Sequence, residues 1–444
     1  MVAGRCSLHQ RFVGGPTATT DTRSMPRFRR RFWSPIKRQY KDGSCIRTVS
    51  LKPLTSRSTS SLPDLLPSLD GIRGIAILLV VTHNLMNALP QPTHGLGRLY
   101  VAVLDRGWIG VQLFFVLSGF LITRILLSTQ TSSNYFSSFF ARRVLRIFPL
   151  YYGSLVLLLV VLPWIHAFPT KISQNPAVEL SNWFYLTNWF APYYRGNSLT
   201  HLWSLAVEEQ FYLVWPLIVW KAPAKRLLPV CAGIVLLSMA TRGFLVWAQS
   251  PEETIYEFTL CRMDALALGA AAAAAFAVPG WAEIIAGRRH QFFAGSLVVL
   301  GLGGIATRGF GISNHWHQVL GYTVLAVALT LALTAAACSD GSVSAAERGP
   351  LRWPVLRKWG RYSYGIYIWH VPLSLLVGVP VLERFGLAKS TNLGVSAMYV
   401  VLMSCLCYLA GILSYKLFEE HFLNLKKYFK PSGSVRLSIP AKEH

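Results

Sequence analysis

Two histidines stand inside apolar stretches of the sequence, where a titratable ring needs a physical reason to be present. The run LDGIRGIAILLVVTHN (69–84) contains Arg73 and, ten residues later, His83, and the run YSYGIYIWH (362–370) ends in His370. On a helix that rises 1.5 Å per residue, His83 lies about 15 Å beyond Arg73. A neutral imidazole can take a proton from a hydroxyl, so both histidines are candidate general bases. A packed histidine bonded to a backbone carbonyl is the structural alternative for each of them.

Carboxylates occur within a third apolar stretch, HLWSLAVEEQFYLVWPL (201–217). Glu208, Glu209 and Gln210 are consecutive, so on a helix they cover about 200° of its circumference. A charge in the middle of a bilayer costs about 2.5–3.5 kcal/mol even on lenient scales. We therefore expect at least one of the three to line an interior cavity. A purely structural polar cluster is the alternative.

Three arginines, Arg142, Arg143 and Arg146, lie within one helical turn in the stretch FFARRVLRIFPLYY (139–152), which we expect to be a cytoplasmic loop leading into a helix. This arginine cluster could anchor the loop on the cytoplasmic side of a membrane. It could equally bind an anion, because a guanidinium group pairs with two phosphate oxygens at once. A phosphorylated cytosolic ligand such as a nucleotide or coenzyme A would suit it. A base inside the membrane beside an anion site predicts group transfer from a phosphorylated donor.

Membrane-spanning helices must position these residues. Hydrophobic residues make up 52% of the 444-residue chain and charged residues only 14%, with a mean hydropathy of +0.40. Soluble domains carry about 25% charged residues, so the sequence predicts an all-α, polytopic membrane protein. The aromatic stretch 180–194 is expected to form a helix at the membrane interface. The ten expected spans are 71–89, 107–127, 148–165, 202–220, 227–248, 262–278, 292–308, 316–338, 364–382 and 394–418.

Lysines and arginines are unequally distributed over the connections between these spans. With the N-terminus in the cytoplasm, eighteen lie on cytoplasmic connections and the C-terminal tail, against six on the opposite side. This bias predicts that both termini are cytoplasmic. The net charge of +24 is then explained by cytoplasmic loops. The apolar composition argues against nucleic acid as a partner, although a basic chain would otherwise suggest it.

The sequence divides into three regions. Residues 1–63 are polar and Arg-rich without an apolar signal-peptide core, and we expect a disordered basic extension. An organellar transit peptide and a start codon assigned too far upstream stay open as alternatives. Residues 64–425 form the expected membrane domain and 426–444 a basic cytoplasmic tail. The seven cysteines have no zinc-site spacing, so we predict neither a metal site nor a disulfide framework.

Six stretches occur in the order in which a known family has them. After LDGIRGIAILLVVTHN come GWIGVQLFFVLSGFLIT (107–123), FFARRVLRIFPLYY, LWSLAVEEQFYLVWP (202–216), RMDALALG (262–269) and YSYGIYIWH. From about Leu69 to Glu420 the chain thereby resembles the integral-membrane acyltransferase family 3, the O-acetyltransferases of bacterial surface polysaccharides. The resemblance implies a multi-pass protein of the cell inner (plasma) membrane. It also implies transfer of an acyl group, usually acetyl from acetyl-CoA, to a hydroxyl of a carbohydrate or lipid-linked glycan.

The resemblance assigns roles to particular residues. Arg73 and His83 match the arginine and histidine that the family needs in its first span. Arg143 and Arg146 match its Arg-x-x-Arg motif. Nine residues stand between Arg73 and His83, one fewer than in the family, so Asn84 occupies the usual histidine position. Because one residue rotates a helical side chain by about 100°, either the helix start adjusts or His83 points differently.

A mechanism follows as a hypothesis. His83 removes the proton from an acceptor hydroxyl, which attacks the thioester carbonyl of acyl-CoA; a relay through an acyl-histidine is the alternative. His370 is a second candidate base, and Glu208 or Glu209 would orient the base or bind the sugar. The arginine cluster would hold the phosphates of coenzyme A. The donor is a substrate, and no permanently bound cofactor is expected.

A transporter or flippase is the rival class, because it too would bury Glu, His and Arg along its pathway. The sequence contains no paired broken helices and no inverted repeat of the kind that many transporters have. A noncatalytic receptor would explain the buried charges poorly. The acyltransferase interpretation predicts acyl-CoA, a carbohydrate or lipid-linked glycan acceptor and membrane lipid as partners.

Overall fold

The computed structural model describes residues 66–165, 176–190, 199–307, 309–311, 314–341 and 349–432. These residues belong to one compact unit, Ser58–His444. They form helices and contain no strand, which confirms the predicted all-α class. The expected N-terminal extension (1–63) and most of the expected tail lie outside the described residues, and so do the tail residues Arg436 and Lys442.

The apolar runs of the sequence form the helices. In the described part of the chain, eight helical stretches are long and apolar enough to cross a membrane, so this is a multi-pass membrane protein. The α-helices are α1 (Pro67–Met86), α2 (Leu96–Leu104), α3 (Ile109–Thr129), α4 (Tyr135–Leu155), α5 (Leu162–Trp164), α6 (Pro176–Trp183), α7 (Thr187–Phe190), α8 (Trp203–Lys221), α9 (Ala224–Trp247), α10 (Glu252–Glu257), α11 (Thr259–Ala277), α12 (Trp281–Gly287), α13 (Arg289–Ala306), α14 (Tyr322–Gly341), α15 (Pro354–Arg361), α16 (Ser363–Leu373), α17 (Val379–Arg384), α18 (Leu393–Ser414) and α19 (Glu420–Asn424).

Two of the ten expected spans are helices that fall outside those eight. They are α8 and α13, which lie where the sequence analysis expected spans. Three consecutive polar residues, Glu208, Glu209 and Gln210, lower the mean hydropathy of α8, and α13 begins with Arg289 and His290. Eight helical stretches therefore satisfy both length and apolarity, where the sequence analysis expected ten.

The boundaries of one span were wrong. The expected span was 148–165, but the helix begins earlier. α4 starts at Tyr135, and the helical stretch continues through η2, a π-helical segment (Val156–Val161), to Trp164. The arginine cluster therefore lies within α4 and not in a loop before it. A helix has a fixed phase, so it aims each arginine in a definite direction.

The aromatic stretch 180–194 does not form one interfacial helix. The described part contains the two short helices α6 and α7. The helical conformation is interrupted between them at Tyr185, which has a φ of 55°. A bulky residue in this left-handed region cannot continue a helix.

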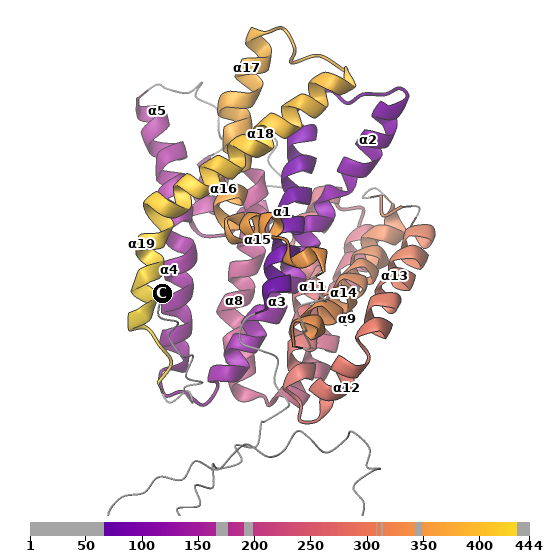
Figure 1. The fold of residues 1–444 in the computed structure, drawn as a ribbon, viewed down its shortest axis with the longest axis vertical. Helices are drawn as coiled ribbons and strands as arrows, with labels where there is room; N and C mark the ends of the chain where they lie inside the picture. Colours follow the sequence, from indigo (N-terminus) through magenta and orange to yellow (C-terminus); the bar gives the residue numbers. More distant parts are fainter. Residues whose placement is uncertain are drawn as a thin grey trace, which may run out of the picture. The chain divides into compact units, whose positions relative to one another are not determined.

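α1 stands in the middle of the bundle in this view (Figure 1). It packs against α3, α14, α15, α16 and α18. In the same view α9, α13 and α14 group on one side, α4 and α19 lie on the other, and α18 crosses obliquely. α3 and α11 approach closely because a glycine of each lies against the other's backbone. A Cβ added at Gly119 would lie 1.9 Å from the carbonyl oxygen of Leu266, and one at Gly269 would lie 2.0 Å from that of Val116.

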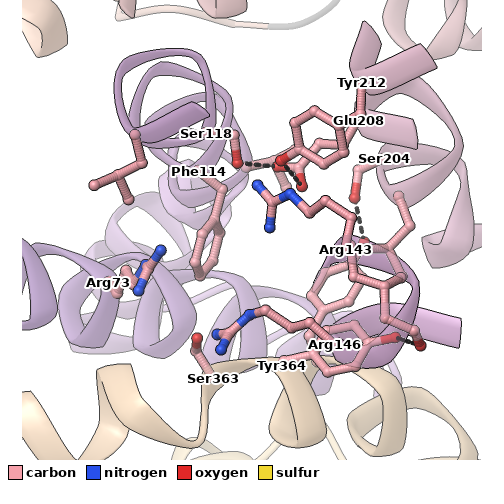
Figure 2. A pocket seen from close by; sticks show the side chains of 15 residues that line it. Arg73, Phe114, Ser118, Arg143, Arg146, Ser204, Glu208, Tyr212, Ser363 and Tyr364 are labelled. Carbon is pink, nitrogen blue, oxygen red and sulfur yellow. Dashed lines mark hydrogen bonds between the residues drawn. The ribbon is translucent and has the colours of Figure 1, made fainter. Parts of the chain in front are cut away.

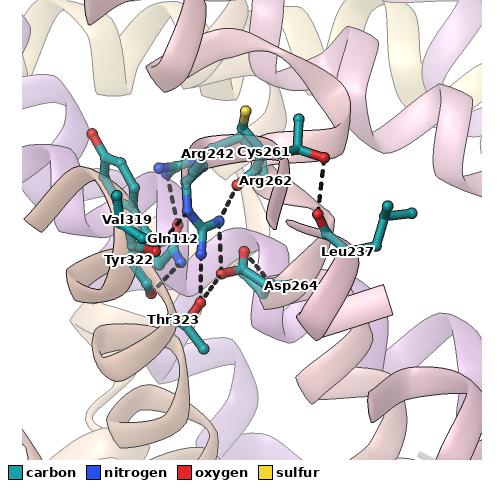
Figure 3. Close-up of polar contacts among 11 residues, drawn as sticks. Gln112, Leu237, Arg242, Cys261, Arg262, Asp264, Val319, Tyr322 and Thr323 are labelled. Atoms are coloured by element: carbon teal, nitrogen blue, oxygen red, sulfur yellow. Dashed lines mark hydrogen bonds and ion pairs between the residues drawn. The ribbon is translucent and has the colours of Figure 1, made fainter. Parts of the chain in front are cut away.

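A buried polar network joins the four helices α3, α9, α11 and α14 (Figure 3). Arg242 of α9 forms an ion pair with Asp264 of α11, with 3.0 Å between Nη1 and Oδ2, and both side chains are fully buried. Thr323 of α14 donates a hydrogen bond to the same carboxylate (2.6 Å). Arg262 donates to Gln112 of α3 (2.6 Å). The sequence analysis did not single out these residues, although each lies in an expected span.

Candidate active site

A cavity of about 110 Å³, which we call the central cavity, lies among α1, α3, α4, α8 and α16. The guanidinium groups of Arg73, Arg143 and Arg146 point into the same space, and Glu208 and Tyr212 lie beside that of Arg143 (Figure 2). Arg73 comes from the first turns of α1 and the other two arginines from one face of α4, one turn apart. The structure thus brings together the two arginine groups that the sequence analysis treated separately.

The two α4 arginines of the central cavity keep their charges open to a ligand. The guanidinium carbon of Arg143 lies 4.3 Å from the ring centroid of Tyr212, a cation–π distance. Among the described residues, no carboxylate forms an ion pair with Arg143 or Arg146, and Nε of Arg143 is buried without a hydrogen-bond partner. Arg73 has only a long contact of 3.9 Å to Asp70. Three cations around one small cavity, against the single carboxylate of Glu208 in its lining, favour an anionic ligand.

A second cavity of about 460 Å³, the basic cavity, adjoins the central one at the end where α1 begins. Arg73, Arg143 and Arg146 line both cavities, so the two meet at these side chains. Arg142 is exposed and lines only the basic cavity. Arg124 of α3 and Lys426 near the C-terminus line it as well. The sequence analysis missed these two, because they are distant from the arginine cluster along the chain.

The three polar residues of α8 have three different environments. Glu208 lines the central cavity and accepts hydrogen bonds from Ser118 Oγ (2.7 Å) and from the hydroxyl of Tyr212 (3.0 Å). Glu209 lines none of the cavities described here, and its Oε1 is buried without a hydrogen-bond partner among the described residues. Gln210 donates to the carbonyl of Tyr185 (2.8 Å) and holds the break between α6 and α7. The expectation that at least one would line an interior cavity is confirmed for Glu208.

The two candidate bases line a third cavity, of about 330 Å³, which we call the histidine cavity. His83 and His370 both border it, although they come from different helices. Arg73 and His83 therefore face different cavities at the two ends of α1, about 15 Å apart along the helix axis. The polar groups singled out in the sequence are thus divided among adjoining cavities. The other lining residues include Asn84, Asn87, Trp108, His201, Trp203, Tyr256, Glu257, Tyr367 and Ser374.

Both candidate histidines are held in the form that can accept a proton. Nδ1 of His83 is 3.1 Å from the carbonyl oxygen of Leu104, and Nδ1 of His370 is 2.6 Å from that of Tyr367. A carbonyl accepts only, so Nδ1 carries the hydrogen in each ring and Nε2 carries the lone pair. The amide of Asn87 donates to Nε2 of His83 (3.2 Å), whereas Nε2 of His370 has no partner among the described residues.

His83 lies in the last turn of α1, because the helix ends at Met86. His83 is thus three residues from the last residue of the helix. The sequence analysis expected this span to continue to residue 89, which would place His83 deeper inside it. Asn84, the neighbour at the family's usual histidine position, donates to the carbonyl of Val80 on its own helix (2.9 Å). His83 borders the cavity in spite of the one-residue shift.

His201 is a further histidine of this cavity that the sequence analysis did not single out. Its ring lies 5.1 Å from that of His370, centroid to centroid, in an edge-to-face arrangement. Burial lowers the pKa of His201 well below its ordinary value, and the neighbouring His370 lowers it further. His201 is therefore neutral at pH 7. Its position just before the apolar part of α8 gave no signal that it would meet His370.

A sequence profile described as an acyltransferase domain matches residues 66–416 of the chain. The chain belongs to this acyltransferase family. It is similar to the peptidoglycan O-acetyltransferase OatA of Listeria monocytogenes, with 29% identity over 74% of this chain and 52% of that protein. It is also similar to the O-acetyltransferase OatA of Staphylococcus aureus, with 30% identity over 71% of this chain and 51% of the relative.

A third relative of this acyltransferase chain is the putative peptidoglycan O-acetyltransferase YrhL of Bacillus subtilis, with 28% identity over 72% of this chain and 50% of the relative. The chain thus spans about half the length of the curated relatives it matches. No solved structure matches this chain. The family resemblance indicated by the six stretches is confirmed.

In this acyltransferase domain, the side chains of Tyr367 and Val111 stand between the central and histidine cavities. Tyr367 lines both, and Val111 is the other residue that they share. The Tyr367 hydroxyl donates a hydrogen bond to the carbonyl of His201 and lies 2.7 Å from Oγ of Ser204. The basic, central and histidine cavities therefore follow one another along the bundle, and Tyr367 and Val111 form the partition between the last two.

Proposed function

We propose that this chain is a membrane-embedded O-acyltransferase. It moves an acyl group, in the first instance acetyl, from acyl-CoA to a hydroxyl of a carbohydrate or lipid-linked glycan. The observation that supports this best is the succession of cavities, with an anion-binding arginine group at one end and proton-accepting histidines at the other. The names of the relatives add that related chains are peptidoglycan O-acetyltransferases.

The donor enters from the basic cavity in this proposal. Arg142, Arg143 and Arg146 hold the phosphates of coenzyme A, and Lys426 extends the positive surface. The thioester arm then lies in the central cavity, where Glu208 and its hydroxyl partners border it. This end is cytoplasmic, in agreement with the charge bias of the connections, and the membrane is the cell's inner membrane.

The acceptor hydroxyl lies in the histidine cavity, whose mixture of aromatic and polar side chains suits a polar ligand. Nε2 of His83 takes the hydroxyl proton as the oxygen attacks the thioester carbonyl carbon. The carbon–sulfur bond breaks, the proton passes to the thiolate, and the products are an ester and coenzyme A. The attack requires Tyr367 to move, because its side chain stands between the two cavities.

The donor site is tested by replacing Arg143 and Arg146 singly with Ala. A charge-assisted hydrogen bond contributes about 1.5–3 kcal/mol, so each loss should raise the KM for acetyl-CoA by about 10–100-fold. Thiol release by the purified full chain measures this. Acetyl-pantetheine, which lacks the phosphates, should be used equally well by the wild type and both variants.

Lys225→Ala is the matched control, because this exposed lysine borders none of the cavities described here. Its KM for acetyl-CoA should equal that of the wild type. Equal loss of activity with acetyl-CoA and acetyl-pantetheine in the arginine variants would contradict the phosphate site. A folded wild-type chain that neither consumes acetyl-CoA nor acetylates any glycan of a panel would favour the transporter class instead.

The partition is tested by Tyr367→Ala, with Tyr367→Phe as the variant that keeps the ring. Removing the ring joins two cavities, so water should reach the thioester and thiol release without any acceptor should rise several-fold. Tyr367→Phe loses only hydrogen bonds, worth about 0.5–1.5 kcal/mol each, and should stay near the wild-type rate. An unchanged hydrolysis rate in a folded Tyr367→Ala protein would show that Tyr367 separates nothing.

A further inference from the structure

The histidine cavity is lined by one acidic side chain, Glu257, that the proposed reaction does not use. Glu257 is the last residue of α10 and borders the cavity together with His83 and His370. Among the described residues its carboxyl group forms no ion pair, and its Oε2 is buried without a hydrogen-bond partner. The amide of Asn188 donates to the backbone carbonyl of Glu257 (3.3 Å) and leaves the side chain free. A buried acceptor of this kind is costly unless a ligand supplies a donor.

The charges around the histidine cavity are unfavourable for an anion. Within the part of the chain that the structure describes, neither an arginine nor a lysine lines it. The guanidinium carbon of Arg262 lies 4.9 Å from the ring centroid of Tyr256, but Tyr256 and not Arg262 borders the cavity. An anionic ligand would therefore lose its water and meet a carboxyl group without a cation to pair with. The cavity suits a ligand that has hydroxyl or amide donors and no negative charge.

Aromatic side chains form one wall of the histidine cavity. Trp108, Trp203 and Tyr256 line it and are in mutual contact. The ring centroids of Trp203 and Tyr256 are 5.0 Å apart, and those of Trp108 and Tyr256 are 6.3 Å apart. The face of an aromatic ring is negative, so it attracts the C–H bonds on the face of a sugar ring. The volume of about 330 Å³ is at the lower end of the range for small-molecule sites, about 300–1,000 Å³, and suits a single ring.

We propose that the histidine cavity binds one uncharged pyranose ring and that Glu257 accepts hydrogen bonds from two neighbouring hydroxyls of that ring. The C–H face of the sugar lies against the aromatic wall. Glu257 is then a specificity-determining residue, because it selects a neutral sugar and disfavours a uronic acid. This inference rests on the proposed function, which makes a sugar hydroxyl the acceptor.

Saturation-transfer NMR on the purified full chain tests the sugar specificity without acetyl-CoA, in a detergent that has no sugar headgroup. The probes are the methyl glycosides of glucose, galactose and mannose, each paired with the uronide that carries a carboxylate at C6. At least one neutral glycoside should bind, and its uronide should bind at least about ten-fold more weakly, because the uronide has no cation to pair with. Failure of all three neutral glycosides to bind would overturn the proposal, and so would a uronide that binds as tightly as its neutral counterpart.

Glu257→Gln tests the role of the carboxyl group, because it keeps the shape of the side chain and removes its charge. The dissociation constant of the neutral glycoside should rise about ten-fold, since hydrogen bonds to charged groups are the stronger ones. The uronide should no longer be repelled, so the ratio of the two dissociation constants should fall close to one. Glu253→Gln is the matched control, an exposed residue of α10 that lines none of the cavities described here, and it should behave as the wild type. Unchanged affinity and discrimination in Glu257→Gln would remove Glu257 from the sugar site.

Thiol release from acetyl-CoA separates this inference from the proposed function. Without an acceptor, Glu257→Gln should release thiol at the wild-type rate, which also shows that the variant is folded. Glycoside binding that depends on Glu257, in a chain that never transfers acetyl, would support the sugar site and contradict the acyl transfer. Acetyl transfer to a non-sugar alcohol, in a chain that binds none of the glycosides, would contradict the sugar site alone.

Discussion

His83→Ala should lower acyl transfer about 10²–10⁴-fold, the usual contribution of a positioned general base. The ring of His83 is fixed by the carbonyl of Leu104, which leaves Nε2 as its proton acceptor at the edge of the histidine cavity. Alanine removes the acceptor and changes nothing in the arginine group at the other end of α1. The KM for acetyl-CoA should therefore stay near the wild-type value while kcat falls. Transfer of labelled acetyl to glycan, with thiol release in parallel, measures both.

Asn84→Ala is the matched control for His83→Ala. Asn84 borders the same cavity, but its amide is bonded to the backbone of its own helix. We expect this variant to stay within a few-fold of the wild type. His83→Ala protein that folds and transfers acetyl at the wild-type rate would remove His83 as the base. His370, with its Nε2 unpartnered among the described residues, would then take its place.

The positions of the helices follow closely from the sequence, because long apolar runs have few other stable structures in a membrane. α9 and α16 begin within a few residues of where the hydropathy indicated, and so does the helical stretch His317–Asp340 that contains most of α14. The start of α4 was predicted too late in the sequence, because its first turns carry arginines and a charged stretch between apolar runs is typical of a loop. A helix continues through such residues when they face a polar cavity, as Arg143 and Arg146 do.

The candidate site was predictable in kind but not in arrangement. An arginine or a histidine in an apolar run signals a buried polar site, and Arg73, His83 and His370 were found in this way. The division into three cavities was not predictable, because it depends on the rotation of each helix and on Tyr367. The same limit explains why Glu208 and not Glu209 lines the central cavity. One residue changes the direction by about 100°, and only packing fixes the phase.

Arg242 and Asp264 show a signal that was present in the sequence and not used. Both lie within consecutive expected spans, 227–248 and 262–278, where a lone charge is unstable. An intramembrane arginine followed by an intramembrane aspartate on the next span predicts an ion pair. The structure contains it, fully buried, with Thr323 as a further partner of the carboxylate.

Asp264→Ala should destabilise the protein by about 3–5 kcal/mol, because it leaves the buried charge of Arg242 without its partner. The double variant Arg242→Met/Asp264→Ala removes both charges and should recover much of this loss, since a buried ion pair offsets little more than its own desolvation. Denaturant titration in detergent micelles measures the free energy of unfolding. Asp105→Ala breaks the exposed pair with Arg106 and should cost at most about 1 kcal/mol. If Asp264→Ala were no less stable than Asp105→Ala, the network would not hold α9, α11 and α14 together.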